Sequence, residues 1–143
     1  MKKIVFVTER MIMGGIEKSL ISKLEKIPKD RYEVTVLLMG NNGELLDRIP
    51  KNVIVKNTFG IEGTTIKRMK GNIKKGRPIT AFKVGWYTWL IQRTKSRFDQ
   101  NRYYSKIAMA EDTEYDLAIA YHGPVSFPVK HVIENITAKR KIA

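Results

Sequence analysis

The sequence contains no cysteine and only two histidines, His122 and His131, among its 143 residues. The absence of cysteine excludes disulfide bonds and thiolate metal sites, and it is compatible with a reducing compartment such as the cytoplasm. The histidines do not have metal-ligand spacing, and there is no paired-carboxylate motif and no Ser-His-Asp order. These residues therefore offer none of the common catalytic or metal-binding patterns.

Long apolar stretches are also missing. A bilayer-spanning helix needs about 20 consecutive apolar residues, and no part of the sequence approaches that length. Two lysines and the apolar run 4–7 look like the start of a secretory signal, but Thr8 ends the run after four residues. We expect no membrane-spanning helix, no export by a cleaved signal and a cytoplasmic location.

Acidic residues are scarce in one part of the chain. The 27 Lys and Arg against 14 Asp and Glu give a formal charge of +13. Between Lys67 and Lys106, twelve basic residues stand against one acidic residue, Asp99, so this basic segment carries +11. Nearly all of the excess positive charge therefore lies in one stretch of the chain.

The hydrophobic pattern predicts one α/β domain with a Rossmann-like parallel sheet and helices on both faces. Short apolar runs typical of strands alternate with helical patterns, as in right-handed crossover units. The expected strands are 4–7, 33–39, 52–56, 116–121 and one from 139 onward, and the expected helices are 16–27, 44–49 and 127–136.

The long interval between the third and fourth strands must carry its own helices, because a loop of that length is rare in a compact domain. We expect helices at 64–75, 80–98 and 101–111, with Thr80 as the N-cap of the second. That second helix has apolar residues on both faces, which predicts that one face packs on the protein and the other contacts something else.

The turn after the first strand is a candidate anion site. Gly14 and Gly15 leave no Cβ between the backbone and a ligand, and the helix that follows offers free N–H groups and a positive dipole end. Neither G-x-G-x-x-G nor a P-loop pattern is present. The alternative is therefore that the two glycines only turn the chain between the strand and the helix. Glu17 in the first helical turn suits a structural role, because a carboxylate there complements the dipole.

A second candidate is His122, which follows the fourth predicted strand. The carboxyl ends of parallel strands are where α/β sheets present side chains to ligands, although a lone histidine is more often structural. Tyr121 and Gly123 flank it and could support such a site.

Two stretches resemble the amino-terminal domain of glycosyltransferase family 4, retaining enzymes of the GT-B fold. The turn Gly14–Leu20 (GGIEKSL) is similar to the G-G-x-E-[RK]-x-L turn of that domain, and Tyr115–Gly123 (YDLAIAYHG) resembles its fourth strand and functional tip. Together they cover about a quarter of the chain. Glu17 matches the family glutamate, whereas the residue at the position of His122 varies within the family.

The resemblance implies a function. Such enzymes move a sugar from a nucleoside diphosphate sugar to a glycan or lipid-linked acceptor, in a cleft between two domains. Because the fold holds the phosphates with helix dipoles and basic residues, the resemblance implies no metal and no other cofactor. Gly14 and Gly15 would approach the donor diphosphate and His122 would bond the sugar. The carboxy-terminal domain, which carries an E-x7-E pattern and most of the nucleotide site, would lie beyond this chain. By itself the chain would then be a fragment that folds but is inactive.

The basic segment has two interpretations. Cations mixed with aromatic residues suit an anionic membrane surface, and they suit the phosphates of nucleic acid equally well. No helix-turn-helix, zinc or RNP-like pattern is present, so we expect no nucleic acid.

By resemblance, the basic segment would seat a polyprenyl-linked acceptor for surface polysaccharide assembly at the inner face of the cell membrane. The alternative is a non-enzymatic, basic Rossmann-like module that binds nucleic acid or a protein partner. The residues expected at an acceptor or membrane surface are Lys70, Lys74, Trp86, Trp89, Arg93 and Arg97.

Overall fold

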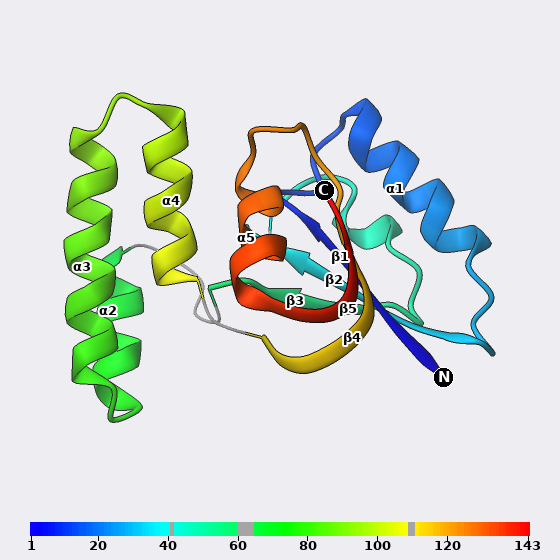
Figure 1. Cartoon of the computed structure of the whole chain (residues 1–143), viewed down its shortest axis with the longest axis horizontal. Helices are drawn as coiled ribbons and strands as arrows, with labels where there is room; N and C mark the ends of the chain where they lie inside the picture. Colours follow the sequence, from blue (N-terminus) through cyan, green and yellow to red (C-terminus); the bar gives the residue numbers. More distant parts are fainter. Residues whose placement is uncertain (41, 60–64, 109–110) are drawn as a thin grey trace.

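The computed structural model describes residues 1–40, 42–59, 65–108 and 111–143. It confirms a Rossmann-like α/β fold built on a five-stranded sheet in which all strands are parallel and the order is β3-β2-β1-β4-β5 (Figure 1). The strands are β1 (Lys2–Thr8), β2 (Tyr32–Leu38), β3 (Ile54–Asn57), β4 (Glu111–Ala120) and β5 (Ile136–Ile142). The helices are α1 (Gly15–Lys26), the 3-10 turn η1 (Leu46–Arg48), α2 (Thr65–Lys74), α3 (Pro78–Arg93), α4 (Arg97–Ile107) and α5 (Phe127–Asn135).

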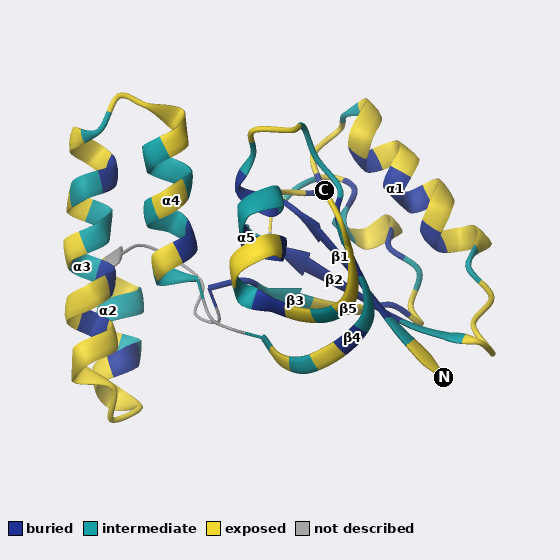
Figure 2. Ribbon diagram, viewed as in Figure 1, coloured by how far each residue is buried: buried dark blue, intermediate teal, exposed yellow. Residues whose placement is uncertain are grey.

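The central strand β1 is apolar because both of its faces are covered. One face packs with α1 in a core that includes Phe6 and Leu20, and the other packs with α5 around Val7 and Val132. Figure 2 shows the buried residues concentrated in the inner strands and the exposed ones on the outer sides of the helices. β1 pairs with β2 on one side and with β4 on the other, so the chain reverses its direction of winding between β1 and β4.

Helices α2, α3 and α4 form the predicted helical insertion between β3 and β4. They pack in sequence beside the sheet, on the side away from α1 (Figure 1). Thr64, where we expected the first of them to begin, lies outside the described residues. Among the described helices, none is long and apolar enough to cross a membrane.

Several predicted boundaries in this region were wrong, for identifiable reasons. The middle helix begins at Pro78, whose missing N–H costs nothing in the first turn, and so Arg77 rather than Thr80 is the N-cap. That helix ends at Arg93 instead of reaching Phe98, because the side chain of Gln100 donates to the carbonyl of Thr94 at 2.7 Å and replaces the missing helical donors. The third helix therefore starts earlier, at Arg97.

The last two strands also differ from their predicted ranges. β4 starts at Glu111, which we had placed at the end of a helix, and β5 starts at Ile136 directly after α5. Both strand starts contain residues with strong β propensity, such as Thr113 and Ile136, but the edge strand β5 has no clear alternation because most of its residues are exposed. The additional residues lengthen the pairing of β4 with β5. They do not affect the pairing of β4 with β1, which involves only residues 117–120 of β4.

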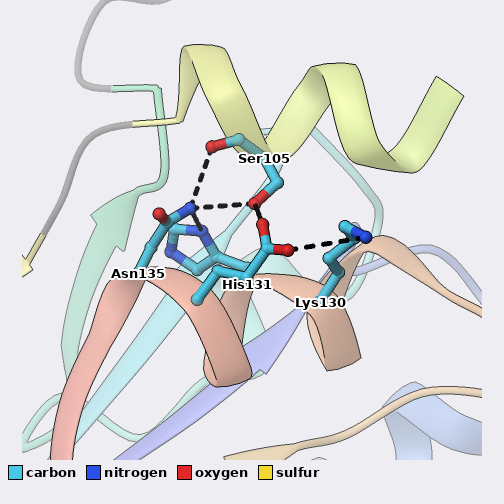
Figure 3. A network of polar contacts seen from close by, with 5 residues as sticks. Ser105, Lys130, His131 and Asn135 are labelled. Atoms are coloured by element: carbon cyan, nitrogen blue, oxygen red, sulfur yellow. Dashed lines mark hydrogen bonds and ion pairs between the residues drawn. The ribbon is translucent and has the colours of Figure 1, made fainter. Parts of the chain in front are cut away.

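A polar network fastens the insertion to helix α5 (Figure 3). The hydroxyl of Ser105 on α4 donates to Glu134 Oε2 at 2.7 Å, which lowers the pKa of that carboxyl. The amide of Asn135 donates to the carbonyl of Ser105 at 2.9 Å and approaches Nδ1 of His131 at 3.0 Å. Lys130 lies 3.5 Å from the other oxygen of Glu134. The contacts join α4 to α5 and so hold the helical insertion in place.

Candidate functional site

The candidate site lies at the carboxyl ends of β1 and β4. The N–H of Tyr121 donates to the carbonyl of Val7 at 2.8 Å, which brings the segment after β4 next to the end of β1. A cavity of about 460 Å³ opens there. Its lining comes from the start of α1 and the end of β4 and comprises Gly15, Ile16, Ser19, Ala120, Tyr121, His122 and Gly123. In a sheet of this topology, the point where the winding reverses is the usual place for a ligand.

The two glycines of the turn have different surroundings. Gly15, the first residue of α1, borders the cavity, and a Cβ built on it would meet nothing within 4 Å. Gly14 is the N-cap with extended backbone, and a Cβ on it would require the carboxylate of Glu17 to move. Glu17 is only 7% exposed and lies against Gly14 instead of lining the cavity. A side chain at Gly15 would therefore reduce the cavity without disturbing the protein around it.

The segment after β2 holds the turn between β1 and α1 through hydrogen bonds. The N–H of Leu45 donates to the carbonyl of Met11 at 2.9 Å, and the N–H of Met13 donates to Glu44 Oε2 at 3.2 Å. Gly43 has φ of +140° and lies so close to the backbone of Met11 that any side chain would collide with it. The turn that leads to Gly14 is thus held in one shape before any ligand arrives.

His122 presents its imidazole at the edge of the cavity. Its Nε2 lies 3.8 Å from Glu9 Oε2, and 27% of the side chain is exposed. Its Nδ1 is buried and has no hydrogen-bond partner among the described residues. Because Nδ1 is buried, the nitrogen that can bond a hydroxyl group of a ligand is Nε2, beside Glu9.

Three polar residues at or beside the site were not singled out by sequence reasoning, namely Ser19, Lys23 and Glu9. The hydroxyls of Ser19 and Tyr121 lie 2.7 Å apart, and the ammonium of Lys23 lies 5.3 Å from the Tyr121 ring centroid. Gly15, Ser19 and Lys23 recur at four-residue spacing, so their common position on α1 could have been found from helical periodicity. Glu9, by contrast, is an isolated acidic residue after a strand, and no sequence signal links it to His122.

The basic and aromatic residues expected at an acceptor or membrane surface lie elsewhere. They are all on the helical insertion, each is exposed, and none belongs to the cavity lining. These residues are Lys70, Lys74, Trp86, Trp89, Arg93 and Arg97. The structure therefore brings the glycine turn together with His122 and separates both from the basic segment.

Fold and cavity together define a Rossmann-like α/β domain with a ligand-sized cavity at the point where its winding reverses. Within the described ranges, no three His, Cys, Asp or Glu side chains lie close enough to hold a metal ion. Comparison of the chain with models of known protein families, with curated protein sequences and with solved structures found no match.

Proposed function

We propose that this chain is the acceptor-side half of a retaining glycosyltransferase that uses a nucleoside diphosphate sugar. The observation that carries the proposal is the cavity that Gly15 and His122 share, since the two motifs that resemble family 4 glycosyltransferases meet there. A helix N-terminus without side chains in the way suits a diphosphate. An adjacent imidazole suits a sugar hydroxyl.

In this proposal each part of the cavity has one task. The free N–H groups at the start of α1 receive the donor diphosphate, with Gly15 leaving the space that it needs. His122 bonds the donor sugar, and Glu9 orients its ring from 3.8 Å away. Helix dipole and N–H groups neutralise the leaving diphosphate, so no metal is required for that step.

The acceptor in this proposal is a glycan or a polyprenyl-linked saccharide used in surface polysaccharide assembly. The proposal places the rest of the nucleotide site in a second, carboxy-terminal domain. Under that arrangement residues 1–143 bind donor weakly and transfer no sugar, because half of the cleft is missing. Detectable transfer by residues 1–143 alone would contradict this division of labour.

The test is sugar transfer by the full-length protein, with a panel of uridine and guanosine diphosphate sugars. Gly15→Val places a branched side chain in the cavity, and we expect turnover to fall about 10²-fold with little change in thermal stability. Ser22→Val is the matched control, because it adds a branched side chain to the same helix outside the cavity lining. Equal turnover in both variants would show that the glycines serve only as a turn.

A non-enzymatic module that binds nucleic acid or a protein remains the second candidate. The observation that favours it is the charge of +11 between Lys67 and Lys106, on helices that do not line the cavity. No transfer with any donor, together with tight binding of nucleic acid by these helices, would favour this candidate over the transferase.

A further inference from the structure

Helix α3 carries a row of exposed apolar side chains. Ile79, Phe82, Trp86 and Trp89 are 83%, 71%, 53% and 45% exposed, and their spacing of three and four residues places them on one face. On the same helix Ala81, Val84 and Ile91 are buried against the protein. Apolar residues thus occupy both sides of α3, and nothing in the described structure covers the outer row.

Helix α2 extends this row into a surface. Its Met69 meets Gly85 of α3, where a Cβ would lie 3.0 Å from the Met69 methyl group. Ile66 and Ile73, three residues before and four after Met69, are 66% and 58% exposed. Likewise, Phe82 comes three residues before Gly85 and Trp89 comes four residues after it. Because α2 and α3 run antiparallel, equal offsets from contacting residues place both rows on the same side of the hairpin (Figure 1).

Cations surround the apolar surface. The stretch 65–93, which spans both helices, contains no Asp or Glu. Lys70 lies between Ile66 and Ile73 on α2, and the guanidinium of Arg93 lies 4.5 Å from the Trp89 ring centroid on α3. The rings of Trp86 and Trp89 stack with centroids 5.6 Å apart. The surface therefore combines protruding aliphatic and indole groups with positive charge.

We propose that this hairpin surface docks on an anionic lipid bilayer, with the apolar row in the interface and the cations at the headgroups. A bilayer matches both properties, since it offers an apolar layer just below negative charge. Nucleic acid would pair with the cations, but it offers no apolar layer for Ile66, Ile73 and Ile79. The proposal is independent of the transferase function, because none of these residues lines the cavity.

The two tryptophans of the protein both lie on this surface, so intrinsic fluorescence reports directly on its contacts. We would titrate residues 1–143 with vesicles of phosphatidylcholine alone and of phosphatidylcholine with phosphatidylglycerol, at low and high salt. We expect a blue shift, and quenching by lipids brominated in the acyl chain, only with phosphatidylglycerol and more weakly at high salt.

Two variants separate charge from insertion. Changing Lys70, Lys74 and Arg93 of the hairpin, together with Arg97 at the start of α4, to Gln should weaken vesicle binding on the order of 10²-fold to 10³-fold. The matched control removes four exposed cations outside the surface, Lys26, Lys29, Arg31 and Lys51, and should bind nearly as well as the original protein. Trp86→Ala should weaken binding about tenfold and leave its salt dependence in place.

The same titration with random duplex DNA tests the competing hypothesis, that the surface binds nucleic acid. Equal loss of vesicle binding in both charge variants would show that overall charge, not this surface, attracts lipid and would overturn the proposal. So would tight DNA binding without a lipid-induced blue shift, which would assign the surface to nucleic acid.

Discussion

His122 is the residue on which the chemistry of the candidate site depends most. Its Nδ1 is buried without a described partner, and its Nε2 faces Glu9. We expect His122→Ala to lower sugar transfer by about tenfold or more, which is less than the effect of Gly15→Val, because it removes one side-chain hydrogen bond and leaves the diphosphate site intact. Steady-state kinetics of the whole protein would measure this. Unchanged kinetics in that variant would make His122 a structural residue.

His131 is expected to make stability depend on pH. The Asn135 amide donates to its Nδ1, so the proton sits on Nε2, which is buried and has no described partner. Burial lowers the pKa of His131 to about 4 from 6.5, while the charge of Glu111 acts in the opposite direction. Between these two values the unfolded chain binds more protons than the folded one. The free energy of unfolding therefore has its full value, as far as His131 is concerned, above pH 6.5. It falls by about 3 kcal/mol as the pH drops from 6.5 toward 4.

The measurement for His131 is the free energy of unfolding by urea at a series of pH values. His131→Gln cannot titrate but retains an oxygen acceptor for Asn135, so its stability should change less than that of the original protein between pH 6.5 and 4. Parallel curves for the two proteins would mean that the pKa of His131 is the same in the folded and the unfolded chain.

At the residue level, the sequence revealed those parts of the site that belong to local motifs. His122 is the second residue after β4, and Gly14 and Gly15 lie where α1 begins; the end of a strand and the start of a helix are both visible in the hydrophobic pattern. The bond between Ser19 and Tyr121 joins residues 102 positions apart, and the approach of Glu9 to His122 likewise depends on the pairing of β1 with β4. Such contacts arise from tertiary packing, which no local pattern encodes.

Among the elements, the inner strands and α1 were predictable from the hydrophobic pattern. The inner strands are continuous apolar runs, and the buried residues of α1 recur at helical spacing. Val5, Val7 and Leu38 come from apolar runs that both faces of the sheet require. The ends of α3 and the start of β4 were not predictable, since the side chain of Gln100 and pairing with β5 determine them. The division of α3 into a buried and an exposed face was visible in the sequence.

The junction of α4 with α5 should control how firmly the helical insertion is attached. Asn135→Ala removes donors to the Ser105 carbonyl and to His131 Nδ1, and both acceptors are poorly exposed. We expect a loss of about 1–3 kcal/mol in the free energy of unfolding and faster amide hydrogen exchange in α4. Asn101→Ala, which removes one exposed bond to the Val125 carbonyl, is the matched control and should cost less. Equal effects would show that the network in Figure 3 contributes no more than a surface contact.

For the whole molecule, the structure separates two surfaces with different properties. The cavity lies at the carboxyl ends of β1 and β4, and the apolar, cationic surface lies on the insertion at the other end of the long axis from α1 (Figure 1). They are connected through α4, which contacts α5 and, through Asn101, the segment that follows His122. If both proposals hold, one molecule carries a donor site and a membrane-docking surface on separate parts of the fold.

The central claim is that the glycine turn and His122 form the site of a nucleoside diphosphate sugar. The most direct measurement is an amide NMR titration of residues 1–143 with uridine diphosphate glucose and guanosine diphosphate mannose, in enough salt to screen the basic segment. We predict chemical-shift changes centred on residues 14–19 and 120–123, reduced by Gly15→Val and retained in Ser22→Val. Changes confined to residues 67–106, or equal changes in both variants, would contradict the claim.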